Sequence, residues 1–425
     1  MKNLFGLVLL LGAHGLWAQL YPNIIITSSK SQLHASEPSL AIDPLNPSRM
    51  MAGSVLHAWH FSNDGGETWQ SGQLKSSLGV WGDPCIVADR EGAFYYFHLS
   101  DVSGKGWGGE HFLDRIVCQR TEDAGDTWTK GSSIGQNRPK VQDKEWAAIS
   151  ADGKRLMVSW TEFDKYKSAD PNDRSRILIS FSDDRGESWT PPKVLSQQTG
   201  DCLDGDGTAE GAVPAAGING EVYVAWGRDG KLWLQRSQDG GLNWLDKEIR
   251  LGKQKGGWDQ EVAGFSRING MPVTKTDLSQ GPYRGHVYVL YSAQNKKHLD
   301  VFLLKSTDGG KKWSKPIKVN QDKSKTDQFL PWLAVDPSTG YLYAVYYDRH
   351  GLVGNATAVS LAISRDGGLS WTNERISEKE FYPSSEVFIG DYNNIDAVNG
   401  VIRPIWVELH QGVKQIKTAI INLQP

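Results

Sequence analysis

Four acidic residues recur at one kind of position in this sequence, at or just before the start of a short apolar run. They are Asp83, Glu145, Glu210 and Asp391. Carboxyl groups gathered in one cleft can act as general acid and as base or nucleophile on a glycosidic bond. If the fold brings these residues together, they are the candidate catalytic groups of an enzyme that acts on oligosaccharides.

Further polar residues stand at the same starts, or at the ends of the apolar runs that follow. An arginine can hold a carboxylate or a sulfate through two hydrogen bonds. We take these residues as candidate substrate-binding groups, although any one of them could instead bind water or cap a turn. The set is Glu37, His98, Glu162, Arg228, Asp348, Arg349, His350 and Tyr392.

One loop is rich in acidic residues. Residues 201–210 form a stretch of ten residues with two glycines, and this stretch contains Asp201, Asp204, Asp206 and Glu210. Alternating acids of this kind resemble a calcium site, which needs several oxygen ligands. The spacing is not that of an EF-hand loop, and a solvated acidic turn is the alternative interpretation. Calcium near Asp204 and Asp206 is therefore kept as a hypothesis, and no other metal or cofactor is expected.

The elements that must position these residues come from an internal repeat. The motif Ser/Thr-x-Asp-x-Gly-x-x-Trp occurs six times, with its tryptophans 59, 61, 55, 69 and 58 residues apart. In such a motif the carboxylate accepts hydrogen bonds from turn N–H groups, glycine supplies a positive φ, and the tryptophan packs against a neighbouring sheet. A catalyst is needed once, so six equal copies indicate a structural role. The tryptophans are Trp69, Trp128, Trp189, Trp244, Trp313 and Trp371.

A second repeat, an apolar hairpin, precedes each motif and also occurs once more near the C-terminus. We expect each hairpin to form the first two strands of a four-stranded unit, with the motif as the turn between the third and fourth strands. The starts of first strands and the ends of second strands then meet at the opposite end of the unit. The seven hairpins span residues 38–55, 84–99, 146–160, 212–226, 285–292, 331–347 and 390–407.

This count predicts an all-β propeller of seven four-stranded blades. The last unit lacks the motif and a fourth strand, and residues 23–28 form a spare strand at the other end of the chain. We expect this N-terminal strand to complete blade seven and remove an open sheet edge. A six-bladed ring with an extra terminal hairpin is the alternative. The long interval before Trp313 predicts an insertion at about residues 252–282, inside blade five.

The composition and the N-terminus bear on location and partners. A net charge of −3 in 425 residues, without a basic stretch, argues against a nucleic-acid partner. Lys2, an apolar run and Ala18 are typical of a signal peptide over residues 1–18. We expect residues 19–425 to form one domain, a monomer without a membrane span, secreted or periplasmic. Three cysteines leave at least one free thiol.

The motifs and hairpins resemble the secreted bacterial BNR/Asp-box repeat proteins of the sialidase-like, glycosyl hydrolase-like superfamily, over the whole mature chain. The stretches at 208–226 and 389–406 resemble members labelled glycosyl hydrolase or exo-α-sialidase-like. The resemblance implies a propeller that acts on glycans. The Phe/Tyr-Arg-Ile-Pro motif that sialidases carry near their start is absent from this sequence.

Three functions follow as hypotheses. The first is a sialidase-like glycoside hydrolase, which requires a close pair of carboxylates in the mouth of the channel. The second is a non-catalytic propeller that binds a glycan or a protein, which requires a shallow mouth with exposed aromatic residues. The third is a polysaccharide lyase that uses Tyr392 with His98 or His350, facing an arginine.

Overall fold

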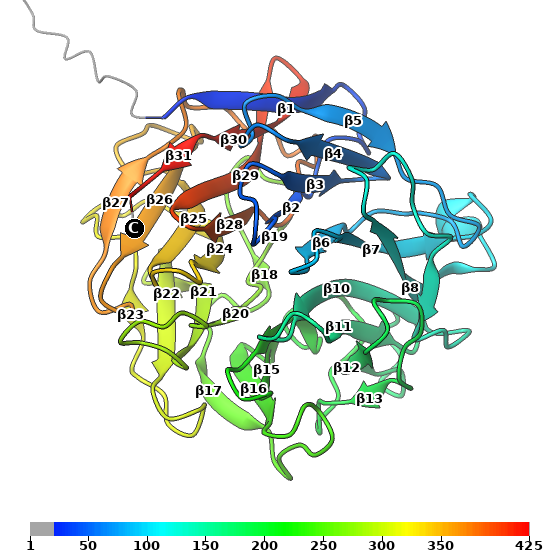
Figure 1. Ribbon diagram of the computed structural model, residues 1–425. Helices are drawn as coiled ribbons and strands as arrows, with labels where there is room; N and C mark the ends of the chain where they lie inside the picture. The colour runs from blue at the N-terminus through cyan, green and yellow to red at the C-terminus, as the bar shows by residue number, and fades with distance from the viewer. Residues whose placement is uncertain (1–20, 425) are drawn as a thin grey trace, which may run out of the picture.

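The computed structural model describes residues 21–424 and contains seven antiparallel sheets arranged as blades around a common axis (Figure 1). The seven-bladed propeller is confirmed, and the six-bladed alternative is wrong. Blade one consists of β2 (Ser39–Ile42), β3 (Met50–Ser54), β4 (Ala58–Ser62) and β5 (Gln70–Gln73). Blade two consists of β6 (Cys85–Ala88), β7 (Phe94–Asp101), β8 (Phe112–Thr121) and β9 (Ser132–Ile134). Blade three consists of β10 (Val141–Ile149), β11 (Leu156–Phe163), β12 (Ser175–Ser182) and β13 (Lys193–Val194).

Blades four to six continue in the same order, each from the axis outwards. Blade four consists of β14 (Glu210–Ala216), β15 (Val222–Arg228), β16 (Lys231–Ser237) and β17 (Ile249–Lys253). Blade five consists of β20 (Val273–Thr276), β21 (Val287–Asn295), β22 (His298–Ser306) and β23 (Ile317–Lys318). Blade six consists of β24 (Gln328–Val335), β25 (Leu342–Asp348), β26 (Ala358–Ser364) and β27 (Thr372–Arg375). The inner strands are buried on both faces because each blade packs between two others, which explains apolar runs such as that of β25.

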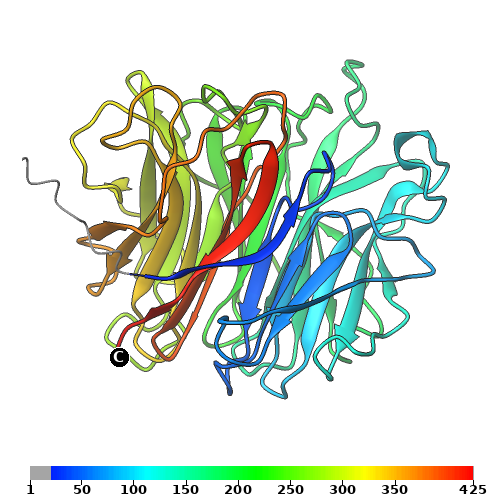
Figure 2. The same ribbon diagram turned by 90° about the horizontal axis from the view of Figure 1, so that it is seen from above.

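Blade seven joins the two ends of the chain. It contains β28 (Asn394–Val398), β29 (Val401–His410), β30 (Val413–Ala419) and, as its outer strand, β1 (Asn23–Ser29). β1 pairs antiparallel with β30, with Asn23 opposite Ala419 and Ser29 opposite Lys414, and Figure 2 shows it alongside the C-terminal strands. The short β31 (Ile421–Asn422) pairs with β29. The predicted closure by the N-terminal strand is therefore confirmed.

The six Ser/Thr-x-Asp-x-Gly-x-x-Trp motifs form the turns between the third and fourth strands. In the blade-three motif, Ser182 Oγ donates to Asp184 Oδ1 (2.8 Å), which also accepts from Ser188 N (2.9 Å). Gly186 N donates to Ser182 Oγ (2.9 Å). The Trp189 ring lies 5.6 Å from the ring of Phe97 in the preceding blade, so the motif closes a turn and joins two blades.

The long insertion lies elsewhere than expected. Because β17 extends to Lys253 and β20 is the first strand of blade five, the insertion is the connection between blades, residues 254–272. The apolar pattern does not reveal β20, because three of its four residues, Thr274, Lys275 and Thr276, are polar. The connection contains the hairpin β18 (Asp259–Gln260) and β19 (Ile268–Asn269), which Figure 1 shows over the middle of the ring.

Two further predictions concern the N-terminal segment and the three cysteines. The signal peptide predicted for residues 1–18 lies outside the described residues. The cysteines Cys85, Cys118 and Cys202 are all free and buried, so all three thiols, and not one alone, are unpaired. The fold thus rests on its strands and on the packing between blades.

Candidate active site

The first strands of three blades begin with an unusual backbone conformation at the upper end of the channel, which we define as the end opposite the Ser/Thr-x-Asp turns. Glu37, Asp83 and Lys144 have φ values of 51°, 49° and 54°, a conformation that costs of order 1–3 kcal/mol for a residue other than glycine. In blade three the pairing of β10 with β11 slips between Asp143 and Trp146. This β-bulge re-aims the side chains at the start of the strand.

The ammonium group of Lys144 lies among carboxylates from three other blades. Its Nζ is 3.1 Å from each oxygen of Asp391, 3.4 Å from Asp83 Oδ2 and 3.6 Å from Glu37 Oε1. Lys144 and Asp391 are buried, with 4% and 1% of their side chains exposed. An isolated charge at this depth would be strongly unfavourable, so these groups stabilise one another.

Arg267, from the connection that contains β18 and β19, adds a second cation. Its Nη2 forms a short ion pair with Asp391 Oδ2 and lies 3.8 Å from Glu37 Oε1. The guanidinium also lies 5.0 Å from the centre of the Phe388 ring. With 39% of its side chain exposed, against 4% for Lys144, Arg267 is the more accessible of the two cations of this cluster.

These contacts set the charges of the cluster. Burial alone would raise the pKa of Asp391, but the charges of Arg267 and Lys144 hold it well below its usual value. Burial would likewise lower the pKa of Lys144, but Asp391 and Asp83 raise it well above its usual value. The centre of the cluster is therefore an ionised Lys144–Asp391–Arg267 group.

Asp143 behaves differently from Asp391. Burial, assisted by repulsion from Asp83, raises the pKa of Asp143 to about 7. Burial and the same repulsion raise the pKa of Glu37 well above its usual value. Near neutral pH the site therefore contains a carboxyl group at Asp143 that can still carry a proton, beside the Asp83 carboxyl group that lies 3.4 Å from Lys144 Nζ.

These groups line a cavity of about 200 Å³. Its charged lining residues include Asp83, Asp143, Lys144 and Arg267. The rest of the lining is largely apolar and aromatic and includes Leu33, Val55, Leu56, Trp81, Leu99, Trp107, Leu113, Tyr166 and Phe388. A few charged groups set against an apolar wall are typical of ligand-binding pockets.

Aromatic side chains fill the channel below the charged cluster. The ring of Trp146 lies 4.2 Å from that of Trp332 and 5.2 Å from that of Tyr392, and Lys144 Nζ lies 5.7 Å from the centre of the Tyr392 ring. The Tyr392 hydroxyl has no hydrogen-bond partner within residues 21–424. The rings lie between the cavity and a second one of about 250 Å³ near the lower end, lined partly by Lys275 and Asp396.

The four predicted catalytic residues occupy different layers. Asp83 lines the cavity, whereas Asp391 reaches it only through Lys144 and Arg267. Glu145 and Glu210 do not line it, and none of their carboxyl oxygens has a hydrogen-bond partner in the described part of the chain. Burial, together with nearby carboxylates, raises the pKa of both glutamates well above the usual value. Both are therefore buried groups of the channel wall in which burial favours the protonated form.

Of the eight predicted binding residues, Glu37 lines the cavity and Tyr392 lies directly beneath Lys144. The others stand at the ends of second strands, one strand further from the axis. They bond mainly to their own blade or its connections. Arg228 donates to Gln198 O (2.6 Å) and Glu248 (2.6 Å), for example. Arg349 Nη2 also donates to Ala263 O (2.6 Å) in the connection between blades four and five. The cavity lining, within residues 21–424, includes none of His98, Glu162, Arg228, Asp348, Arg349 and His350.

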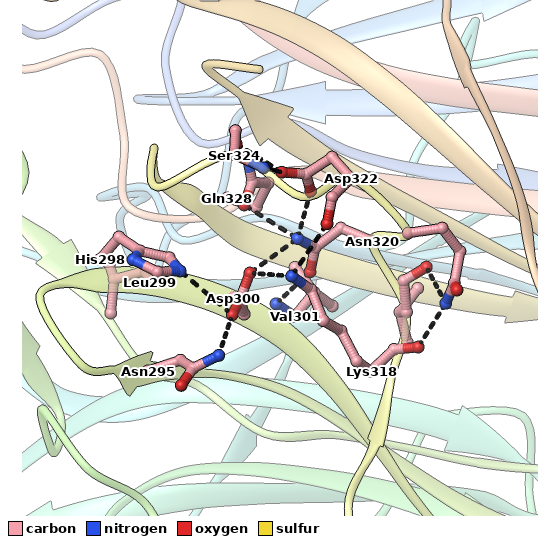
Figure 3. A network of polar contacts seen from close by, with 12 residues as sticks. Asn295, His298, Leu299, Asp300, Val301, Lys318, Asn320, Asp322, Ser324 and Gln328 are labelled. Atoms are coloured by element: carbon pink, nitrogen blue, oxygen red, sulfur yellow. Dashed lines mark hydrogen bonds and ion pairs between the residues drawn. The ribbon is translucent and has the colours of Figure 1, made fainter.

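Figure 3 shows a polar network between blades five and six that includes Asp300, Asn320 and Gln328, and Asp348 joins this network through Gln328. Gln328 Nε2 donates to Asp348 Oδ1 (3.0 Å), and Gln328 Oε1 accepts from Asn320 Nδ2 (2.9 Å). Asn320 also donates to Asp300 (2.8 Å), which pairs with Lys318 (2.9 Å). Such a well-paired network rigidifies the structure and explains why Asp348 is held away from the channel.

The acidic loop around Asp204 uses its carboxylates as acceptors for protein donors. Tyr166 OH donates to Asp204 Oδ2 (2.5 Å), Thr208 Oγ1 to Asp201 Oδ1 (2.8 Å), and Asp259 N to Asp206 Oδ1 (3.0 Å). Across residues 21–424 no group of three or more histidine, cysteine, aspartate or glutamate side chains is arranged to hold a metal ion. The donor set therefore does not fit the calcium hypothesis.

The cavity residues that were not identified from the sequence include Trp107, Asp143, Lys144, Tyr166 and Arg267. The run Asp143-Lys144-Glu145 directly before an apolar strand was a signal for two of them. The length of the connection before blade five was a signal for Arg267. Nothing in the spacing marked Trp107 or Tyr166, because both lie in connections of irregular length.

The fold and the site define a seven-bladed β-propeller with a charged, partly aromatic cavity at one end of its channel. An ulvan lyase of polysaccharide lyase family PL25 is similar to this chain, with a TM-score of 0.53 and 14% identity over 94% of this chain and 96% of the lyase. The NanB sialidase of Streptococcus pneumoniae has a TM-score of 0.50 and 9% identity over 88% of this chain and 83% of the sialidase. At these identities the likeness shows the fold.

No protein-family model matches the sequence, and no curated protein matches it. Within residues 21–424 there is no helix long and apolar enough to cross a membrane. The site therefore has to be interpreted from its own geometry.

Proposed function

We propose that this chain is an exported, carbohydrate-active enzyme, a sialidase-like glycoside hydrolase of the Asp-box propeller type whose active site is the upper cavity. The observation that carries this proposal is the pair Asp83 and Asp143. Both line the cavity, and repulsion from Asp83 helps to raise the pKa of Asp143 to about 7. Paired carboxyl groups with different protonation states are the usual equipment for glycoside hydrolysis.

In this proposal Asp143 is the general acid. It gives its proton to the glycosidic oxygen as the bond between that oxygen and the sugar carbon breaks. Asp83, held by Lys144 at 3.4 Å, stabilises the positive charge that develops on the sugar or attacks its carbon. Water then supplies the hydroxyl group of the released sugar, and its remaining proton restores the acid.

The cations of the cavity favour a substrate that carries an acidic group. Arg267 is partly exposed and Lys144 also lines the cavity, so a carboxylate or a sulfate can replace part of the contact with Asp391. The related ulvan lyase structure that binds -[GlcA(1-4)Rha3S]- supports an anionic glycan as ligand of this fold. The predicted signal peptide, outside the described residues, supports secretion to the periplasm or the medium, and we propose a monomer.

The test is product release by the purified mature chain from a panel of sialylated, uronic-acid, sulfated and neutral glycans. A new reducing end, lost in Asp143→Asn and Asp83→Asn, would support the hydrolase and identify its substrate. Asp152→Asn is the matched control, because Asp152 lies in an exposed turn. No product from any glycan would overturn the proposal, and measurable binding in that case would favour a non-catalytic glycan-binding propeller.

A polysaccharide lyase is the second candidate, because the cavity also holds the hydroxyl-bearing Tyr166 together with Lys144 and Arg267. A lyase needs cations that neutralise the uronate carboxylate and a group that moves a proton. The structural likeness to the ulvan lyase supports this alternative. An unsaturated product that absorbs in the ultraviolet, formed without uptake of water, would select it over the hydrolase.

A further inference from the structure

Trp107 is a large apolar side chain left open to solvent at the rim of the cavity. It belongs to η1 (Gly106–Gly108), in the connection between the second and third strands of blade two, and 61% of it is exposed. It lines the cavity together with Tyr166 from blade three. An exposed tryptophan beside a charged pocket loses the free energy that burial would provide, which points to a ligand that covers it.

The ring of Trp107 is held in place from two blades. It stacks on Tyr166, with centroids 4.8 Å apart and planes at 20°, and meets the edge of Phe112 at 4.7 Å. Below it, Tyr166 packs against Phe163 at 5.2 Å and donates a hydrogen bond to Asp204 (2.5 Å).

The turn that carries Trp107 is also fixed. Gly106 N donates to Asp101 Oδ2 (2.8 Å), and Ser103 Oγ donates to Asp101 Oδ1 (3.0 Å). Asp101 itself is buried. A ring that is exposed but already ordered loses little conformational freedom when a ligand covers it, and such preorganisation increases affinity.

The chemistry of the rim differs from that of the cavity. The cavity offers carboxyl groups and cations, whereas the rim offers the flat face of an indole, which suits the C–H face of a pyranose ring. We propose that Trp107, supported by Tyr166, is a stacking subsite for the sugar next to the one in the cavity, so that the preferred substrates are oligosaccharides of two or more units. This inference rests on the proposed function and deepens it.

The test compares Trp107→Ala with the wild type on two substrates that share the sugar bound in the cavity. One is an oligosaccharide, and the other is the single-sugar glycosyl fluoride, which has no ring to place on Trp107. We expect kcat/KM on the oligosaccharide to fall about tenfold or more, mainly through KM, and that on the fluoride to change less than about twofold. Trp107→Phe should recover most of the loss.

Tyr382→Ala is the control, because Tyr382 is 59% exposed but is not part of the cavity lining. Equal losses on both substrates, or none on either, would overturn the subsite. If the wild type turns over neither substrate, the proposed function fails, and calorimetric binding of the oligosaccharide then decides the inference. Weaker binding to Trp107→Ala would uphold the subsite, and unchanged or absent binding would reject it.

Discussion

Asp143 is the residue whose protonation state matters most for the proposed chemistry. Its pKa of about 7 means that the general acid holds its proton below neutral pH and loses it above. We therefore predict that kcat/KM decreases as the pH rises above about 7. Asp143→Asn should lower kcat/KM by about 10²–10⁴-fold and remove this alkaline decrease. An unchanged pH profile in the variant would show that another group is the acid.

We predict that the stability of the protein depends on pH because of two buried residues, Glu145 and Glu210. Their folded-state pKa values are raised above the ordinary 4.5, so the folded protein binds more protons than the unfolded chain above about pH 4.5. Stability must then decrease as the pH rises through this range, by up to about 1.4 kcal/mol for each pKa unit and residue. Thermal unfolding from pH 5 to 8 should show a smaller decrease of Tm in the Glu145→Gln, Glu210→Gln double variant than in the wild type.

Glu187→Gln is the matched control for that experiment, because the Glu187 side chain is 70% exposed. The control should unfold like the wild type at every pH. If Tm depends on pH in the same way in the double variant and in the wild type, the two glutamates have the same pKa in the folded and the unfolded state. This result would contradict the expected effect of their burial.

At the scale of elements, the connection between blades four and five carries the more accessible cation of the site. Arg267→Ala removes the exposed partner of Asp391 but leaves the contact with Lys144. We expect a loss of about 1–3 kcal/mol in the free energy of unfolding, measured with urea. We also expect a loss of activity on anionic glycans. Arg267→Lys should retain more stability than Arg267→Ala, and equal stability of both variants would contradict a role for the charge.

The residues at the starts of the first strands show which features of the site can be predicted from the sequence and which cannot. The order of strands predicted that first-strand starts meet at the upper end, and Glu37, Asp83 and Asp391 do meet there around Lys144. At the start of β10 a β-bulge shifts the register by one position, and Asp143 and Lys144 line the cavity whereas Glu145 does not. A shift by one residue exchanges the faces of a strand, and no spacing in the sequence marks it.

At the scale of the whole molecule, closure of the ring depends on one short strand. Without β1, the edge of β30 is open, and exposed edges pair with other chains. Deletion of residues 21–29 should lower Tm strongly and produce aggregates in size-exclusion chromatography. A synthetic peptide with the sequence of β1 should restore monomers, whereas a scrambled peptide should not. A truncated chain that remains monomeric with the wild-type Tm would contradict closure by β1.

The fold itself could be predicted almost completely, because seven hairpins and six turn motifs report the same unit many times. Each copy of the turn uses local contacts, such as those of Ser182 and Asp184, which a short motif encodes. The site occurs only once and is assembled from many separate segments, among them those of Asp143, Arg267 and Trp107. Contacts between such distant segments depend on connection geometry, which a single sequence does not reveal.

The most direct test of Asp143 as the acid of a glycoside hydrolase compares two leaving groups in Asp143→Asn. One substrate releases an acidic phenol, which leaves without protonation, and the other releases an alcohol, which requires a proton. The account predicts nearly wild-type bond cleavage with the phenol and a loss of about 10²-fold or more with the alcohol. Equal losses with both leaving groups, or no loss with either, would contradict it.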